Sequence, residues 1–345
     1  MPPRSYYVEP RPSDYIAVAV AFFPDQANLA REFTERTQLP YVESVEHLCA
    51  YIGVAPSLIR QIQHKKKYHY RTFLLPKNDG SSRQITSPKT YLKVVQWWIY
   101  DNILSCAALP DCVHGFRASR SFITNANVHL GRKHILNVDI KRFFPSITIE
   151  MVKQQFRKLG YGEAGAGLLA DICTLYDCAP TGAPTSPALG NLVLTELDGR
   201  FVEFATSRGF LYTRYADDIT FSSADLINEA VLDEISSTVA TFGFSLNTKK
   251  TRFMGSGDRQ EVTGLVINHR PTMPREWRNQ MRGYLHRVLC APDKYLAERN
   301  RVLGVYGTLK MLDPNGEQKL TRMAATACKA LSNSGSTAAN AQVDV

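Results

Sequence analysis

The sequence lacks any long hydrophobic run free of charge. No stretch of its 345 residues approaches the roughly 20 apolar residues that a membrane-spanning helix requires. The segment 1–15 is rich in proline and charged residues and contains no apolar core of the kind found in secretory signals. We therefore expect a cytoplasmic protein with no membrane partner.

Cysteine is sparse, and its spacing forms no recognisable pattern. The chain has seven cysteines, an odd number, and no pair is separated by the two residues typical of a zinc ribbon. Neither a disulfide framework nor a structural zinc site is indicated. The cysteines are expected to be reduced residues that pack in the interior.

Charge, in contrast, is abundant and unevenly distributed. The formal net charge is +9, but residues 58–142 carry +11 and residues 270–331 carry +7, so the remainder sums to −9. Basic segments on either side of an acidic middle suit a groove for nucleic acid with a cation-binding centre. The alternative is a solvated, lysine-rich surface.

Hydrophobic periodicity predicts several helices in the middle of the chain. Thr148 can cap a helix that Gly160 ends, and a longer, core-facing helix is expected from Ser186 to just before Gly209. A further amphipathic helix runs through 231–239. With 44% apolar side chains overall, the chain can bury a substantial core.

Short runs rich in β-branched and aromatic residues predict strands between these helices. Asp139 lies near the end of the first run, and the pair Asp217-Asp218 lies in the turn between the next two. The predicted strands are 135–140, 210–215, 219–222, 252–254 and 262–267. The order β-α-β-β-α-β predicts an α/β (α+β) fold with a ferredoxin-like antiparallel sheet, in which Asp139 and the Asp217-Asp218 turn meet.

Three aspartates converging in this way match the needs of phosphoryl transfer with two metal ions. Such sites hold two Mg²⁺ ions about 4 Å apart, and each ion takes only a few protein oxygens besides phosphates and water. An Asp-Asp pair is weak evidence by itself, because most such pairs are turn residues or solvated charges.

The segment Tyr215-Ala216-Asp217-Asp218 resembles the catalytic motif of reverse transcriptases, and further blocks in the same order resemble other motifs of that family. The similarity covers roughly residues 70–268. The blocks are Arg83-Gln84-Ile85 with Pro88-Lys89 and Leu92-Lys93, His114-Gly115-Phe116-Arg117, Asn137 to Phe144, Gly182 to Pro187, and Leu246-Asn247 with Lys249-Lys250-Thr251. Six ordered blocks at suitable spacing make coincidence a remote explanation.

Two shorter elements resemble those of retron reverse transcriptases in particular. They are Asn125-Ala126 followed by His129, and Val262-Thr263-Gly264. This resemblance implies a right-hand polymerase with fingers, a ferredoxin-like palm and a helical thumb. The expected domains are an N-terminal helical extension over 1–57, fingers with palm elements over 58–134, a palm over 135–268, a thumb over 269–331 and a flexible tail over 332–345.

The resemblance also implies an activity and partners. A retron enzyme binds a cognate structured noncoding RNA (msr-msd), primes from a guanosine 2′-OH and uses dNTPs to make branched, RNA-linked single-stranded DNA (msDNA). Two Mg²⁺ ions, or Mn²⁺ in their place, and an effector protein of an antiphage defence system would accompany it. The alternatives are a group II intron-like or diversity-generating reverse transcriptase, and an RNA-binding scaffold without turnover.

Site residues follow by position within the motifs. The three aspartates and the backbone of Ile140 are expected to hold metal. Lys250, or the adjacent Lys249, is expected to act at the leaving pyrophosphate.

The nucleotide is expected to contact a second group of residues. Lys77 and Arg83 would hold the triphosphate, and Phe144 would exclude a ribose 2′-OH or else be an ordinary core aromatic. Gly182 would let the backbone approach the nucleotide. Thr181 stands where many relatives have Gln, which puts a Gln-mediated contact in doubt.

RNA is expected to contact a basic and aromatic segment before the first motif, the Asn-Ala-x-x-His element and a C-terminal helix. Exposed charged surface, or a purely structural role for the histidine, is the alternative. The candidates are Lys65, Lys66, Lys67, Arg71, Asn125, His129, Arg278, Arg282 and Arg287.

Overall fold

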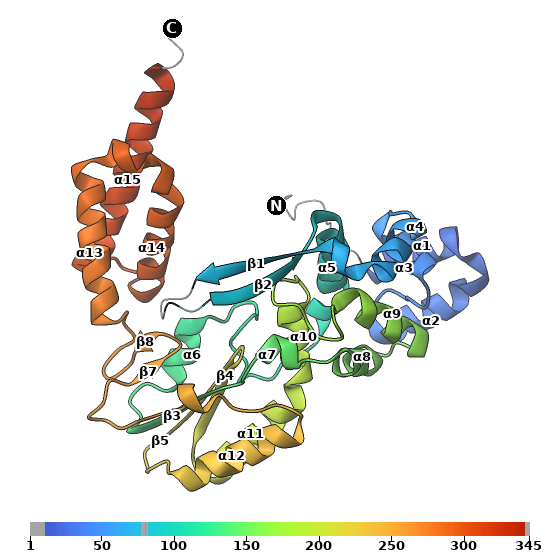
Figure 1. Ribbon diagram of the computed structural model, residues 1–345, viewed down its shortest axis with the longest axis horizontal. Coiled ribbons are helices and arrows are strands. Elements are labelled where there is room, and N and C mark those ends of the chain that lie inside the picture. The colour runs from blue at the N-terminus through green and yellow to red at the C-terminus, as the bar shows by residue number, and fades with distance from the viewer. Residues whose placement is uncertain (1–10, 77–79, 81, 342–345) are drawn as a thin grey trace.

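A computed structural model of the chain describes residues 11–76, 80 and 82–341. The chain runs from N-terminal helices through a long hairpin into a four-stranded sheet, and ends in a helical bundle that stands apart from the sheet (Figure 1). Within these residues, no helix is both long and apolar enough to cross a membrane.

The helices occur in three groups along the chain. The N-terminal group is α1 (Pro12–Phe22), α2 (Ala27–Thr37), α3 (Val45–Ile52) and α4 (Pro56–His64). The middle group is α5 (Thr90–Asn102), α6 (Phe122–Val128), α7 (Phe143–Ser146), α8 (Ile149–Lys158), α9 (Glu163–Cys173), α10 (Ser186–Val193), α11 (Thr195–Ser207) and α12 (Glu229–Thr241). The C-terminal group is α13 (Arg275–Cys290), α14 (Arg299–Leu312) and α15 (Lys319–Ala341).

The strands form one sheet of four strands and two separate hairpins. The strands are β1 (Tyr70–Pro76), β2 (Ser82–Pro88), β3 (His134–Asp139), β4 (Leu211–Tyr215), β5 (Asp218–Ser223), β6 (Arg252–Met254), β7 (Glu261–Val262) and β8 (Leu265–Val266). The four-stranded sheet has the order β4-β5-β3-β6 with antiparallel pairing throughout. In this sheet β3, the first of its strands along the chain, lies between the β4–β5 hairpin and β6. This order confirms the predicted ferredoxin-like arrangement.

Alternation along β3 divides the sheet into two faces. Leu136 and Val138 enter the large core, where α11 and α12 cover the sheet. Ile135 belongs instead to a small cluster with α6 and the β7–β8 hairpin. Asn137 and Asp139 alternate with the core residues, so Asp139 lies on the face that α11 and α12 leave uncovered.

Local signals explain where several helices begin and end. The Thr148 hydroxyl accepts a bond from the backbone N–H of Met151 at 3.3 Å, as an N-cap does, and Gly160 has a φ of 102° just after α8. Gly209 and Gly243 have positive φ directly after α11 and α12. The predicted cap and stops are therefore confirmed.

The structure differs from the sequence prediction between Ser186 and Gly209. The expected single helix is interrupted at Leu194, which separates α10 from α11. The carbonyl of Asn191, which would accept a bond from Thr195 N–H in a continuous helix, accepts bonds from the side chains of Thr195 at 3.2 Å and Arg214 at 3.5 Å. Side chains inserted into the helical bonding pattern explain the break.

Two further segments were not predicted correctly. Residues 163–173 form α9, which the sequence analysis did not identify, and its small residues pack against the N-terminal region: a Cβ at Gly165 would lie 2.0 Å from the Val42 carbonyl oxygen. The tail expected from Ser332 continues α15 as far as Ala341.

Candidate active site

The Asp217-Asp218 pair lies at the tip of the β4–β5 hairpin. Tyr215 pairs with Asp218, so the turn between the strands contains only Ala216 and Asp217. Ala216 has a φ of 58°, in the region that glycine normally occupies in such two-residue turns. A non-glycine residue held there is strained and depends on its surroundings to keep it in place.

Strand pairing brings Asp139 to the same point. In the register of β3 with β5, Asp139 lies opposite Asp218, and the Ile140 N–H donates to the carbonyl oxygen of Asp217 at 3.0 Å. Residues opposite each other in an antiparallel pair project from the same face of the sheet. Asp139 therefore meets the Asp217-Asp218 pair as predicted, although at least 78 residues separate them along the chain.

Asp139 is held by the segment before β6. Lys250 Nζ lies 2.8 Å from one carboxylate oxygen of Asp139, and Asn247 Nδ2 donates to the other at 3.2 Å. The backbone N–H of Asn247 also donates to the carbonyl oxygen of Asp139 at 2.8 Å. Both lysines considered from the sequence are exposed, and of the two it is Lys250 whose ammonium contacts an aspartate within the described residues.

The aspartates repel one another strongly. Loss of hydration in the cleft, followed by repulsion from Asp217 and Asp139, raises the pKa of Asp218 to about 6. The pKa of Asp217 is raised by the same causes, burial first and then Asp139. Burial works against the charged form of Lys250, but its bond to Asp139 raises its pKa overall. The tip is thus an incompletely neutralised negative site.

The carboxylates at the tip suit a divalent ion that keeps water and phosphate among its ligands. Across the described ranges, no three His, Cys, Asp or Glu side chains converge closely enough to enclose one ion by themselves. Mg²⁺ does not need such an enclosure, because it is commonly bound by one or two carboxylates together with substrate phosphates and water. Asp217, Asp218 and Asp139 fit that chemistry, with Ile140 beside them in the cleft wall.

A cleft of about 990 Å³ opens next to the aspartates, a size typical of a ligand site. Arg83 of β2, Phe144 of α7, Asp217 and Lys250 line it, so most of the predicted nucleotide contacts share one cavity. Phe144 is half-buried, and its ring centroid lies 6.5 Å from that of Phe116. Lys77, the other predicted triphosphate contact, lies outside the described residues.

Thr181 and Gly182 both pack on β2, a structural role that the sequence did not indicate; their contact with the nucleotide stays a prediction. The Thr181 hydroxyl accepts a bond from Thr86 N–H at 3.0 Å and donates to the Gln84 carbonyl at 3.2 Å. A Cβ at Gly182 would lie 2.9 Å from the Thr86 carbonyl oxygen. Close packing on β2 therefore requires glycine at position 182, and the Thr181 hydroxyl is occupied by β2, although Thr181 also lines the cleft.

The predicted RNA contacts before β1 are mostly accessible. Lys65, Lys67 and Arg71 are exposed, and Lys67 Nζ lies 5.2 Å from the ring centroid of Tyr68. Lys66 differs, because its Nζ is 2.5 Å from a carboxylate oxygen of Asp171 and its charge is thereby paired.

Helix α13 presents arginines on its surface. Arg282 and Arg287 are exposed, while Arg278 is half-buried and its Nε has no hydrogen-bond partner within the part of the chain that the structure describes. The helix packs on α15 through Tyr284, Leu285 and Val288, which are buried. The arginines alternate with this buried stripe and remain available to a partner.

The predicted RNA contacts of Asn125 and His129 are wrong. Their exposed fractions are 1% and 0%. The His129 ring bridges the two strands of the β4–β5 hairpin, 2.7 Å from the Ser222 hydroxyl and 2.7 Å from the Thr213 hydroxyl. Burial lowers the pKa of His129 to about 3, so the ring is neutral and structural. His129, directly after α6, thus ties the end of that helix to the hairpin.

Sequence reasoning overlooked two residues at this site. Asn247 was noticed as part of a motif but was given no role, although it holds both the side chain and the backbone of Asp139. Tyr176 lines the cleft with 75% of its surface exposed and a φ of 51°. Asn247 and Tyr176 belong to no spacing pattern in the sequence that would have predicted these positions.

Comparisons with known proteins agree with this geometry. The family described as reverse transcriptase (RNA-dependent DNA polymerase) matches residues 75–282. The Retron Mx65 reverse transcriptase of Myxococcus xanthus is 34% identical over 325 residues, which cover 87% of this chain and 74% of that protein. The Retron Ec86 reverse transcriptase of Escherichia coli is 31% identical over 286 residues, covering 82% and 88%.

A solved structure of telomerase from Candida albicans with a fragment of telomeric RNA is also similar. It aligns with 68% of this chain and 55% of that chain, at 11% identity and a TM-score of 0.42. This likeness is too low to bear on function.

Proposed function

The chain belongs to the retron reverse transcriptases and is an RNA-directed DNA polymerase, and on that premise we propose that Asp139, Asp217 and Asp218 are its catalytic aspartates. The observation that carries the proposal is the pairing of Asp139 with Asp218 at one end of the sheet. Family membership implies a divalent metal. We propose two Mg²⁺ ions, with Mn²⁺ as a substitute, held by the three carboxylates and the backbone of Ile140.

Bound divalent ions supply activation of the attacking hydroxyl and neutralisation of charge on the phosphates. The protein contributes position and local charge. Asp217 and Asp218 concentrate negative charge at the hairpin tip, while Asn247 and Lys250 fix the orientation of the Asp139 carboxylate. We propose that the Lys250 ammonium, in the wall of the cleft, also neutralises charge on the leaving pyrophosphate.

The cleft of about 990 Å³ is the proposed site of the incoming dNTP. Arg83 projects from β2 into this cavity and suits bidentate binding of phosphate oxygens, with Lys77 proposed beside it. Phe144 is the proposed gate against a ribose 2′-OH, because a ring against the sugar leaves no room for the extra hydroxyl.

RNA and the growing duplex are proposed to follow two basic surfaces. Lys65, Lys67 and Arg71 would contact RNA backbone near the β1–β2 hairpin, and Arg278, Arg282 and Arg287 would contact phosphates along α13. Exposed arginines on a helix suit phosphate contacts, which fix position without reading sequence.

Because its relatives are retron enzymes, we propose that the chain acts on a cognate noncoding RNA of msr-msd type. In this proposal a guanosine 2′-OH of that RNA attacks the α-phosphate of the first dNTP, which forms a 2′,5′ bond and releases pyrophosphate. Continued synthesis would give branched msDNA. An effector protein in an antiphage defence system is the proposed protein partner.

The nucleic acid that copurifies with the protein tests this proposal directly. After RNase treatment of the purified complex, we expect a short DNA whose end stays joined to a few ribonucleotides, and a debranching nuclease should release that stub. DNA with a free 5′ end would contradict 2′-OH priming while leaving RNA-directed synthesis intact. A protein that synthesises no DNA on any RNA would favour the scaffold alternative.

A further inference from the structure

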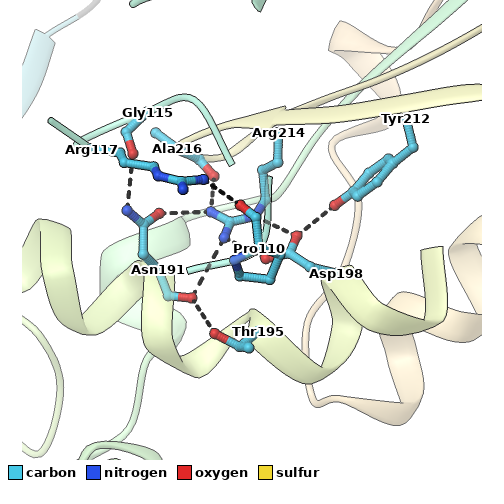
Figure 2. A network of polar contacts seen from close by, with 9 residues as sticks. All are labelled: Pro110, Gly115, Arg117, Asn191, Thr195, Asp198, Tyr212, Arg214 and Ala216. Atoms are coloured by element: carbon cyan, nitrogen blue, oxygen red, sulfur yellow. Dashed lines mark hydrogen bonds and ion pairs between the residues drawn. The ribbon is translucent and has the colours of Figure 1, made fainter. Parts of the chain in front are cut away.

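A buried ion pair lies directly beneath the turn that carries Asp217 (Figure 2). Arg214 of β4 and Asp198 of α11 both have side chains that are 0% exposed. Arg214 Nε and one terminal nitrogen each donate to a different oxygen of Asp198 at 2.7 Å. The Tyr212 hydroxyl donates to Asp198 as well, at 2.6 Å.

Stability alone does not account for this pair. Removing two charges from water costs several kcal/mol per ion, and apolar residues of similar volume are often as stabilising as a buried ion pair. A guanidinium, however, has five N–H groups in a fixed plane, and only two of them donate to Asp198. The other N–H groups are available to further acceptors.

The third nitrogen of the guanidinium reaches the catalytic turn. Arg214 Nη1 donates to the carbonyl oxygen of Ala216 at 3.1 Å and to Asn191 Oδ1 at 3.0 Å (Figure 2). Ala216 is the residue with left-handed backbone conformation, and its carbonyl carbon is bonded to the nitrogen of Asp217. The bond from Arg214 therefore fixes the peptide that directly precedes the proposed metal-binding side chain.

Asn191 extends the network to the opposite side of the turn. Its Nδ2 donates to the carbonyl oxygen of Gly115 at 2.9 Å. The backbone of Gly115 lies against the turn so closely that a Cβ there would be 2.4 Å from Ala216 N. The loop before it is bonded to the backbone of Arg214 itself: the Arg214 N–H donates to Cys112 O and the His114 N–H donates to Arg214 O, each at 2.8 Å.

This contact also links the turn to the wall of the nucleotide cleft. Phe116 follows Gly115, has a φ of 55°, and has its ring 6.5 Å from the ring of Phe144. Asn191 is bonded directly to the backbone that leads to Phe116, and through Arg214 Nη1 it is linked to the backbone that leads to Asp217. A shift of the network would move both together.

We propose that Arg214 and Asn191 are positioning residues for nucleotide transfer, which hold the Ala216-Asp217 turn against the Gly115 loop. The proposal rests on the proposed catalytic role of the aspartates. A strained turn relaxes unless neighbouring groups fix it, and a displacement of about 1 Å at a reacting centre costs on the order of 10²-fold in rate.

Asn191→Ala is the most direct test, because it leaves the Arg214–Asp198 pair in place. We expect kcat for dNTP incorporation on an RNA template to fall on the order of 10²-fold, with a much smaller change in dNTP KM and none in RNA affinity. Amide hydrogen exchange should become faster in the peptides covering 110–117 and 211–218 and stay unchanged in α12.

Thr195→Val is the matched control. The Thr195 hydroxyl donates to the Asn191 carbonyl oxygen at 3.2 Å, within the same network, but makes no contact with the turn. This variant should keep the parent kcat and the parent exchange pattern. An equal loss of kcat in both variants would mean that any damage to this region lowers activity, and the proposal would be wrong.

A double variant separates position from stability. Arg214→Met with Asp198→Leu replaces the ion pair by apolar side chains but leaves the Tyr212 hydroxyl and Asn191 Oδ1 without these partners, so a moderate fall in Tm is expected. We expect it to lose kcat and to show fast exchange at 211–218 at temperatures well below that Tm. If it does not fold, Asn191→Ala decides alone; if it folds and polymerises at the parent rate, the positioning role is refuted.

Failure of this inference is distinguishable from failure of the proposed function. Exchange at the turn is measured without substrate, so it reports on the network whether or not Asp217 binds metal. Normal synthesis by an Asp217→Ala variant would remove the proposed catalytic centre. Unchanged exchange in Asn191→Ala, with synthesis lost in Asp217→Ala, would remove only the positioning role.

Discussion

The four-stranded sheet and the C-terminal bundle differ in how their charged side chains are arranged. At the end of the sheet, three carboxylates crowd together with Lys250 as a neighbouring cation, and the pKa of Asp218 is raised to about 6 as a result, burial being the largest cause. In the bundle, α13 buries an apolar stripe in a core separate from that of the sheet and leaves Arg282 and Arg287 exposed.

From this difference we infer that the sheet carries the catalytic residues and the bundle contributes to RNA affinity. Like charges held close together require a rigid support, which the sheet supplies through buried, partnered side chains such as Arg214 and His129. Phosphate contacts require accessible charge and tolerate mobility. Substitutions at the sheet should therefore change the rate, and substitutions on the bundle should change the RNA affinity.

The largest expected effect follows removal of the two hairpin carboxylates. Asp217→Ala with Asp218→Ala should lower DNA synthesis by about 10⁴-fold or more, because the groups proposed to hold metal are lost. RNA affinity, measured by filter binding or fluorescence anisotropy, should stay the same or rise slightly because negative charge has been removed.

The matched control removes two negative charges elsewhere on the same region. Asp225 and Asp233 are exposed on the segment after β5, and their double alanine variant should retain synthesis. If both double variants lost RNA binding, the division between sheet and bundle would fail. Normal synthesis by the Asp217-Asp218 variant would eliminate the proposed active site.

The meeting of these aspartates could be predicted from the sequence because it depends on strand order alone. Alternating runs identified β3, β4 and β5, and the ferredoxin-like order then required Asp139 to lie beside the hairpin tip. The helix caps and stops were equally local, since Thr148 and the glycines act within a few residues. Local signals and strand order were therefore sufficient to predict the position of the aspartates and the ends of these helices.

Three of the errors have a different physical origin. His129 and Asn125 appeared to be polar residues available for RNA, yet their burial depends on how α6 packs against the hairpin, 84 or more residues away in the case of the His129 contacts. The break at Leu194 depends on Arg214, and the role of Gly182 depends on β2. Long-range partners of polar side chains leave no periodic trace in one sequence.

The next largest effect is expected on the selection of dNTPs over ribonucleotides. Phe144→Ala should raise the ratio of kcat/KM for a ribonucleotide to that for the matching dNTP by about 10- to 100-fold, because the ring no longer occupies the space of a 2′-OH. Phe144→Tyr keeps the ring and should keep the selectivity. RNA affinity should be unaffected in both, since Phe144 lies in the cleft of the sheet region. Unchanged selectivity in Phe144→Ala would show that the ring is a packing residue only.

A smaller effect is expected on the bundle. Arg282→Ala with Arg287→Ala should weaken RNA binding and reduce the slope of log K against log salt by about 1 for each phosphate that is no longer neutralised, while kcat at saturating RNA stays near the parent value. Arg157→Ala with Arg208→Ala removes the same charge from side chains that pair with glutamates near the sheet, and should change little. Equal salt slopes in the two double variants would contradict a specific role for α13.

The smallest effect is a pH dependence of the free energy of unfolding that arises from His129 at the β4–β5 hairpin. Burial lowers the pKa of His129 to about 3 in the folded protein, whereas its ordinary value is 6.5. Between these values the unfolded chain binds a proton that the folded chain does not, so the free energy of unfolding falls as the pH falls from 6.5. The contribution is about 1.4 kcal/mol per pH unit for one histidine.

His129→Gln should therefore flatten the decline in stability between pH 6.5 and 5, while its curve stays parallel to that of the parent above pH 7. Urea unfolding can be followed by tryptophan fluorescence in a Trp277→Phe background, because Trp97 and Trp98 lie in α5 and Trp277 packs against the bundle core. The remaining signal then reports on the core that supports the hairpin. An equal slope in both proteins would mean that His129 is protonated in the folded state, and that the hairpin is supported by a charged group where the geometry requires a neutral one.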